Sequence, residues 1–375
     1  MKICRLWLVC LSLVFLMGKA EAQIAEEWGE RPDGGYYRIV DLDGRFITET
    51  AWDIGKGDLY IAEDNSRYII DRFDGDTVYA RYDGKEKMPD VTPKGGLAAF
   101  LEWAVSAVGG AKNKQNKNTV AIYHTHSAES YKPTSGTESK TPRGDIYEVG
   151  KALAEALEKE GYNVDYSQDV FLPHDGQAYV RSRRVAAEFA KARPQTILDV
   201  HRDAIPDPNS YRATVNGEQM SQIRLVVGKQ NQNRDANLAY AKRIKAVADE
   251  EYPGLIKGIF HARGNYNQDI GPRTILLEFG THTTTLEEAK KSAELMAKVL
   301  PIAAGMAPGT AEAAEKEIGS GAMRTFWWVL GIALVGIVGF ALLNKEGLRG
   351  LLGAKVGGSL GSQGEAGEKQ STDEE

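Results

Sequence analysis

The sequence predicts an α/β protein whose main domain, over residues 119–301, is a largely parallel sheet flanked by helices. Two observations predict this fold class. Short apolar runs alternate along these residues with segments in which apolar residues recur at helical spacing. Hydrophobic residues make up 42% and charged residues 26% of the 375-residue chain, which is ordinary for a globular protein. A small β-rich domain is predicted before the main domain, and one C-terminal transmembrane helix after it.

Residues 1–22 have the pattern of a secretory signal peptide. Basic residues precede an apolar stretch at 6–17, and the small-x-small sequence Ala20-Glu21-Ala22 follows it. A helix of about twelve residues spans about 18 Å, which is shorter than the hydrocarbon core of about 30 Å. Cleavage after Ala22 is therefore favoured over an uncleaved anchor.

Charge and cysteine content exclude other classes of protein. The chain has 46 basic and 52 acidic residues, a net charge of -6, and no long basic run. This lacks the electrostatic footprint of a nucleic-acid-binding protein, so we expect no nucleic-acid partner. Both cysteines, Cys4 and Cys10, lie in the signal segment. Any metal site in the exported part must therefore use His, Asp and Glu.

Residues 23–105 are predicted to form the small β-rich domain. Runs rich in β-branched and aromatic residues alternate there with Asp-Gly pairs at 43–44, 74–75 and 83–84, which is typical of hairpins. Residues 106–118 are predicted to be a linker because their last part is polar and has no apolar period.

Strands and helices alternate through the main domain. Because ligands of such sheets lie beyond the carboxyl ends of the strands, we expect the functional site there. Strands are predicted at 119–123, 196–200, 223–227 and 274–277, and helices at about 146–157, 178–192, 234–250 and 286–300.

The C-terminal part predicts a single membrane span. Residues 302–325 are rich in Ala, Gly and Glu and are predicted to be a linker. Residues 326–343 are eighteen uncharged residues that open with Phe-Trp-Trp, as expected for a transmembrane helix. Residues 344–375 are predicted to be a disordered cytoplasmic tail. This topology places the main domain on the extracytoplasmic side of the cell membrane.

Histidines at the ends of predicted strands indicate a metal site. His126 and Glu129 follow the first strand of the main domain, and His201 ends a later one. Two imidazoles and a carboxylate with an open fourth position are the pattern of a catalytic Zn2+ site. Two alternatives stay open: His124 in place of His126, and Glu148 in place of Glu129. Asp199 and Asp203 flank His201 and are candidates for orienting it.

Glu278 is the predicted general base and acid. It ends the apolar strand 274–277, and burial of a carboxylate costs several kcal/mol unless it is paired or functional. A carboxylate beside a zinc-bound water can take its proton and pass it to a leaving amine. The order His-x-x-Glu, distant His, distant Glu is also that of zinc carboxypeptidases, which attack amide bonds.

Four motifs are spread over about 119–300: Ile122-Tyr-His-Thr-His-Ser-Ala-Glu-Ser-Tyr131, Asp199-Val-His-Arg-Asp-Ala204, Asn267-Gln-Asp269 and Leu276-Leu-Glu-Phe-Gly280. Together they resemble the stage II sporulation protein P family. The resemblance implies a zinc amidase-like domain in a membrane-anchored peptidoglycan hydrolase. It also implies N-acetylmuramoyl-L-alanine amidase and endopeptidase activity during forespore engulfment, with stage II sporulation proteins D and M as partners. Typical members have an N-terminal anchor, unlike the topology predicted here.

The mechanism implied by the residues and the resemblance is hydrolysis of the amide between muramic acid and the stem peptide. Arg202 or Arg273 is the candidate for stabilising the developing oxyanion. Two other functions compete with the amidase. One is a catalytically inactive scaffold that binds peptidoglycan, and the other is a carboxypeptidase or endopeptidase that cuts only within stem peptides.

Overall fold

The computed structural model describes residues 29–31, 33–91 and 116–306. The predicted signal peptide, transmembrane helix and cytoplasmic tail lie outside the described residues, as does most of each predicted linker. Within the described part of the chain, no helix combines the length and the apolar character needed to cross a membrane.

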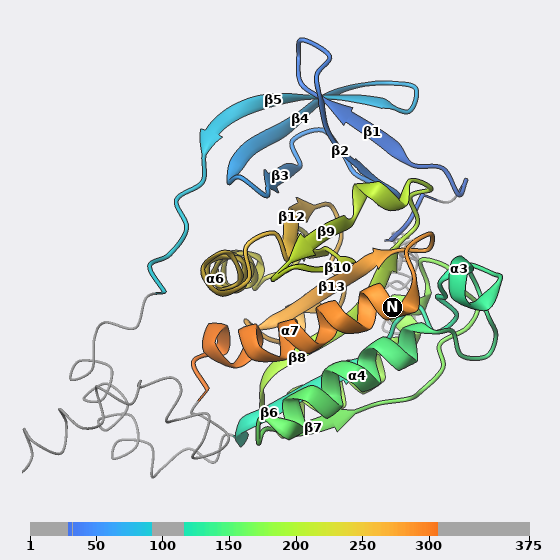
Figure 1. The fold of residues 1–375 in the computed structure, drawn as a ribbon, viewed down its shortest axis with the longest axis vertical. Coiled ribbons are helices and arrows are strands. Elements are labelled where there is room, and N and C mark those ends of the chain that lie inside the picture. Colours follow the sequence, from blue (N-terminus) through green and yellow to red (C-terminus); the bar gives the residue numbers. More distant parts are fainter. Residues whose placement is uncertain (1–28, 32, 92–115, 307–375) are drawn as a thin grey trace, which may run out of the picture. The chain divides into compact units, whose positions relative to one another are not determined.

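Eleven of the described strands form one sheet in the order β2-β1-β5-β4-β3-β12-β11-β13-β8-β6-β7, and β9 and β10 form a separate pair (Figure 1). The strands are β1 Tyr37–Val40, β2 Phe46–Thr50, β3 Leu59–Ala62, β4 Ser66–Asp74, β5 Thr77–Lys85, β6 Asn116–Tyr123, β7 Asn163–Tyr166, β8 Pro194–Asp203, β9 Arg212–Val215, β10 Glu218–Ser221, β11 Ile223–Gly228, β12 Ile256–Ala262 and β13 Thr274–Thr281.

The strands after residue 115 pair mostly in parallel, as predicted. Pairs β12-β11, β13-β8, β8-β6 and β6-β7 are parallel, and β11-β13 is antiparallel. Strands covered by protein on both faces read as continuous apolar runs, which is why β6, β8, β11 and β13 were predicted from the sequence. No strand was predicted at the positions of β7, β9, β10 and β12.

The N-terminal strands β1 to β5 extend this same sheet. β3 pairs antiparallel with β12, and the rings of Tyr60 and Phe260 pack 4.7 Å apart across the junction. Apolar side chains of both regions share one cluster, so the described strands of the predicted β-rich domain continue the sheet of the main domain. The Asp-Gly pairs at 43–44 and 74–75 lie at the β1-β2 and β4-β5 connections, but Asp83-Gly84 lies within β5.

Helices cover both faces of the sheet. Figure 1 shows α4, α6 and α7 along one face, whereas α5 packs on the other, against Tyr123 of β6 and its neighbours. Thr285 and Glu288 form a capping box that starts α7. The helices are α3 Lys132–Ser135, α4 Ile146–Lys159, α5 Ala178–Ala192, α6 Arg234–Glu251 and α7 Leu286–Ala304, with short 3-10 helices η1 Pro208–Ser210 and η2 Gln268–Ile270.

Two predicted boundaries of the main domain shift in the structure. β6 begins at Asn116, so residues 116–118 belong to the sheet and not to the linker. α7 continues to Ala304, three residues beyond the predicted end of the domain at 301. β6 extends through polar residues because Asn116 still pairs with Pro194 of β8. α7 extends because Ala303 and Ala304 are buried against the apolar core.

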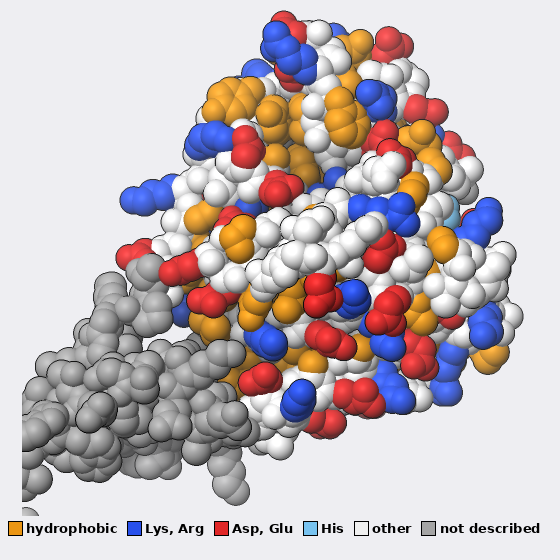
Figure 2. Space-filling view, in the orientation of Figure 1, with side chains coloured by type: hydrophobic (Ala, Val, Ile, Leu, Met, Phe, Trp, Pro, Cys, Tyr) orange, Lys and Arg blue, Asp and Glu red, His pale blue; other side chains and the backbone are white. Residues whose placement is uncertain are grey.

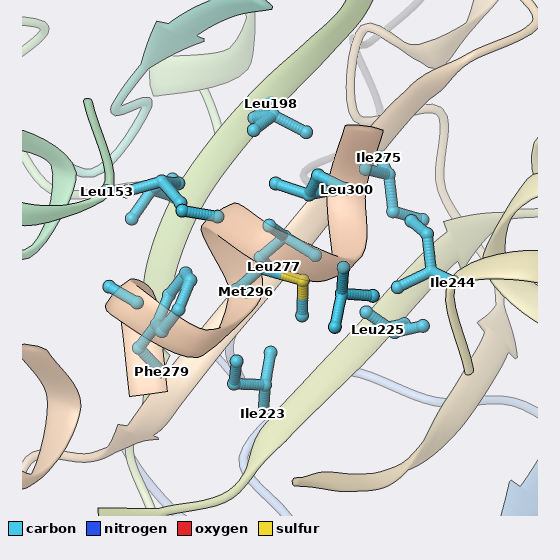
Figure 3. Packing of buried hydrophobic residues seen from close by; sticks show 14 of the residues in the cluster. Leu153, Leu198, Ile223, Leu225, Ile244, Ile275, Leu277, Phe279, Met296 and Leu300 are labelled. Atoms are coloured by element: carbon cyan, nitrogen blue, oxygen red, sulfur yellow. The ribbon is translucent and has the colours of Figure 1, made fainter. Parts of the chain in front are cut away.

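The largest apolar cluster lies between the sheet and helices α4, α6 and α7. Figure 3 shows Met296 and Leu300 of α7 over Leu277 and Phe279 of β13. Leu277→Ala is expected to lower the free energy of unfolding by about 2–5 kcal/mol, because it removes a fully buried side chain and leaves a cavity. Urea denaturation measures this. The matched control Leu42→Ala removes an exposed leucine, and an equal loss there would contradict the assignment of this core.

Candidate active site

A row of buried polar side chains crosses the sheet on the face that carries α5. Asp199, His201 and Asp203 alternate along β8 and therefore point to one face. The strand register places Glu278 of β13 beside His201, and Arg224 of β11 beside Glu278. Each is at most 1% exposed. Because β8 and β13 end near this row, it lies where the sequence predicts the site.

His126, Glu129 and His201 come together at one end of this row. Glu129 Oε1 lies 3.2 Å from His126 Nδ1 and 3.1 Å from His201 Nδ1. One ligand atom from each residue lies within 4.8 Å of the other two, and all three side chains are buried. His126 Nε2 is buried without a hydrogen-bond partner. Two imidazoles and a carboxylate are the donors that zinc takes in hydrolytic sites, so these residues fit the predicted ion.

Asp199 lies behind His201. Its Oδ1 is 2.9 Å from His201 Nε2, although the two atoms are not aligned for a hydrogen bond. Thr125 holds the same carboxylate through its main-chain N–H and its hydroxyl, at 2.9 and 2.6 Å. A carboxylate that contacts one ring nitrogen orients the other nitrogen toward a metal. The predicted orienting role therefore fits Asp199.

Electrostatics favour positive charge among these donors. Burial lowers the pKa of His201, but Asp199 and Glu129 outweigh burial and raise it well above the usual value. Burial raises the pKa of Glu129, but His201 and Arg202 outweigh it and hold that pKa well below the usual value. Glu129 is therefore a carboxylate that attracts cations.

His124 lies on the opposite face of the sheet from these donors. Its Nδ1 contacts Val200 O and its Nε2 contacts the Tyr166 hydroxyl, both at 2.9 Å. Burial lowers its pKa to about 4. Strand alternation would place residues two apart on the same face, but β6 ends at Tyr123 and both histidines lie beyond it. Of the two, only His126 contacts Glu129. Glu148, the alternative to Glu129, is exposed on α4.

His124→Ala is therefore expected to destabilise the protein without removing metal. The substitution removes the two buried hydrogen bonds of the His124 ring, to Val200 O and to the Tyr166 hydroxyl, at a cost of about 1–3 kcal/mol in the free energy of unfolding. Denaturation with parallel measurement of bound zinc checks this. Loss of zinc at unchanged stability would instead make His124 a ligand.

Glu278 is held by residues from three separate segments. Its Oε1 accepts a hydrogen bond from the Trp52 indole N–H, and its Oε2 lies 2.9 Å from the Tyr211 hydroxyl. The Arg224 guanidinium is 3.7 Å from Oε2 and 2.6 Å from Asp203 Oδ2. Asp203 thus binds Arg224, not His201 as its position in the sequence suggested.

The Tyr211 hydroxyl lies between the carboxyl groups of Glu278 and Asp203. The Tyr211 oxygen is 2.9 Å from both Glu278 Oε2 and Asp203 Oδ2, but a hydroxyl can donate to only one of them. Burial, and then Asp203, raise the pKa of Glu278 to about 8, against smaller lowering effects of Arg224, Trp52 and Tyr211. The pKa of Glu278 therefore lies close enough to neutral pH for this carboxyl group both to accept and to release a proton.

Of the two predicted arginines, only Arg202 lies at the donors. Its main-chain N–H donates to Glu129 Oε2 at 3.0 Å, and its buried guanidinium binds Glu30 Oε1 at 2.8 Å. Arg273 immediately precedes β13 and is exposed. It lies at the amino end of that strand, whereas the site lies toward the carboxyl end, so the prediction for Arg273 is wrong.

A short N-terminal segment covers the donors. Residues Gly29 to Arg31 pair with the loop after β2 through two hydrogen bonds, from Asp53 N to Gly29 O and from Arg31 N to Ala51 O. A side chain at Gly29, whose φ is +134°, would lie 3.5 Å from the His126 ring. Figure 2 shows interspersed acidic and basic side chains and almost no histidine surface on the face that it presents.

A search of protein-family descriptions supplies the family. The description "Stage II sporulation protein P (SpoIIP)" matches residues 65–301. The chain belongs to the stage II sporulation protein P family. The predicted resemblance is thereby confirmed, and the match begins about fifty residues earlier than the predicted extent, so it includes β4 and β5.

A curated member of the family and several solved structures are similar to this chain. Stage II sporulation protein P of Bacillus subtilis (strain 168) is 32% identical over 203 residues, which are 49% of this chain and 50% of the relative. The chain thus spans about half the length of that relative. An N-acetylmuramoyl-L-alanine amidase from Clostridium difficile 630 is 18% identical at a TM-score of 0.32, with 50% of this chain and 94% of that chain covered. The CwlD amidase from Clostridioides difficile, in complex with the GerS lipoprotein, is 15% identical at a TM-score of 0.33, with 50% and 95% covered.

One motif of the SpoIIP resemblance has a structural role: it holds α5 against the sheet. The Asn267 side chain binds Tyr179 O and the Ser182 hydroxyl, at 2.9 and 3.1 Å. Gln268 binds the main chain of β11 through Gly228 N and Val226 O, both at 2.9 Å. The motif thereby fastens α5 to the sheet beside the donors.

Sequence reasoning missed several residues at this site of the SpoIIP domain. Trp52 and Glu30 come from the N-terminal region and carry no local signal. His174 lies in a loop, stacked on His126 with 4.1 Å between ring centroids. Arg224 did carry a signal, because a charged residue inside the apolar run of β11 requires a buried partner.

Proposed function

We propose that this protein is a zinc-dependent N-acetylmuramoyl-L-alanine amidase whose substrate is peptidoglycan. The observation that supports this most directly is the convergence of His126, Glu129 and His201 beside Glu278. Two imidazoles, one carboxylate and a nearby acid-base group are what hydrolysis of an amide by a metal enzyme requires. Membership of the SpoIIP family is consistent with this reaction.

His126, Glu129 and His201 are the proposed zinc ligands. Zinc in such a site lowers the pKa of a bound water from 15.7 to about 7 and polarises a carbonyl group. Asp199 keeps the His201 ring in place through its contact with Nε2, and the Arg202 main-chain N–H fixes Glu129 through Oε2. The donors are thus oriented before any ligand arrives, which avoids the energetic cost of ordering them later.

Glu278 is the proposed proton carrier. It accepts the proton of the attacking water and delivers a proton to the leaving amine, which becomes the free amino group of the stem peptide. Trp52 and Tyr211 hold its two oxygens, so the carboxyl group keeps one orientation in both protonation states. Arg202 is the proposed source of positive charge for the developing oxyanion.

The remaining parts of the proposal rest on the sequence and on the resemblance. We propose that the protein also cleaves peptide cross-links. We place it as a single-pass membrane protein whose catalytic domain is extracytoplasmic, anchored by the apolar run 326–343. Its role would be in engulfment of the forespore, together with stage II sporulation proteins D and M.

The test is to incubate the purified full-length chain with defined peptidoglycan, with added zinc or with a chelator, and to identify the products by mass. Zinc-dependent release of intact stem peptides from muramic acid is the expected result. Products cut only within stem peptides would favour the endopeptidase. No product under any metal condition, also with the partner proteins supplied, would favour the scaffold.

A further inference from the structure

We propose that Arg202 and His174 form a carboxylate-binding subsite beside the candidate zinc ligands, and that the Glu30 carboxylate of the same chain occupies this subsite in the structure. The subsite would take a peptide substrate that carries a carboxylate close to the amide to be cut. Only the identity of that peptide rests on the proposed function. The subsite itself is argued from the contacts of Glu30, Arg202 and His174.

Arg202 provides the charge of the subsite. Its side chain is 4% exposed, its NH1 lies 2.8 Å from Glu30 Oε1, and its NH2 donates to Glu138 O at 3.2 Å. Its Nε is buried without a hydrogen-bond partner. A buried guanidinium requires an anion nearby, because an unpaired buried charge is strongly destabilising. Glu30 is the only anion that an ion pair joins to Arg202 within the described residues.

His174 provides a second polar wall. Its Nε2 lies 3.7 Å from Glu30 Oε2 and has no hydrogen-bond partner. Its ring stacks on the candidate ligand His126. An acid group held between Arg202 and His174 therefore lies next to the metal donors, where a group of the substrate close to the reacting amide would lie.

Glu30 lies in a segment that few main-chain hydrogen bonds hold to the rest of the protein, unlike Arg202, which lies within the sheet. Arg202 belongs to β8 in the centre of the sheet, whereas Glu30 lies in the short covering segment, with its side chain 23% exposed. Two main-chain hydrogen bonds join this segment to the loop after β2. An external carboxylate can replace Glu30 without disturbing the sheet, so we infer that Glu30 competes with substrate.

A metal ion, in addition to the proposed zinc, is the alternative ligand at Glu30 and His174. Glu30, Glu129 and His174 have ligand atoms within 4.8 Å of one another, a spacing that also suits a metal ion. The guanidinium of Arg202, 2.8 Å from Glu30, repels a cation and attracts an anion. The charge around Glu30 therefore favours a carboxylate over a metal.

The test measures binding by calorimetry, using the full-length chain and N-acetyl-L-alanyl-D-glutamate as the probe. Glu30→Gln is expected to bind the probe at least about tenfold more tightly than the parent chain. The Glu30 carboxylate is a tethered competitor, and such a competitor acts at an effective concentration of the order of millimolar. The fully amidated probe is expected to show no such gain. Adding Arg202→Gln to Glu30→Gln is expected to abolish it. Glu155→Gln, which alters an exposed carboxylate on α4, is the matched control.

Equal affinity of the parent and Glu30→Gln for the acidic probe would overturn the proposal, as would an equal gain for the amidated probe. Zinc titration separates the cation alternative, since a fall from two bound ions to one on Glu30→Gln would assign Glu30 to a metal. None of these measurements requires hydrolysis. A failed amidase assay with the expected binding gain would therefore remove the proposed function and leave the subsite.

Discussion

Glu278→Gln is expected to lower the rate of amide hydrolysis by about 10²–10⁴-fold while zinc content and fold are retained. Glutamine has nearly the same size and shape as glutamate. Its oxygen can accept from Trp52, and its amide can donate to Tyr211, so the contacts of the native side chain are kept. What is lost is the ability to accept and release a proton.

The measurement is release of stem peptides from peptidoglycan at saturating zinc, with bound zinc determined on the same sample. Glu155→Gln serves as the control for loss of a carboxylate outside the site. Normal turnover by Glu278→Gln would remove Glu278 from the mechanism. A slow variant that has also lost zinc would indicate that Glu278 acts on the metal site and not on a proton.

His201→Ala is expected to weaken zinc binding by more than about 100-fold, since even partners outside the ligand shell contribute 10–100-fold to metal affinity. The substitution removes one of the three converging donors. It also leaves the carboxylates of Asp199 and Glu129 facing each other without the ring that now lies between them.

Zinc content after dialysis against a metal buffer, measured by mass spectrometry, checks this prediction. His124→Ala is the control, because it removes a buried histidine from the other face of the sheet. Glu129→Gln provides a second variant that removes a donor with little change in shape. Stoichiometric zinc in folded His201→Ala would show that the ligand assignment is wrong.

The apolar pattern by itself determined the main elements of the domain. Alternating apolar runs and helical spacing predicted four strands of the sheet and helices α4 to α7 nearly to their ends, because burial against a sheet imposes these periods on the sequence. The sequence also predicted His126, Glu129, His201 and Glu278 as site residues, since polar residues that follow apolar strands lie at the edge where ligands bind. The structure brings the first three together and places Glu278 beside His201.

Only the tertiary structure decided how these residues act together. Residues two apart in the sequence, His124 and His126, point to opposite faces, and nothing local distinguishes them. Trp52 reaches Glu278 because β3 pairs with β12, a long-range pairing that joins the N-terminal strands to the same sheet. Glu30 binds Arg202 across 172 residues of sequence. Such contacts depend on strand order and on burial of charge in three dimensions, which short-range periodicity does not record.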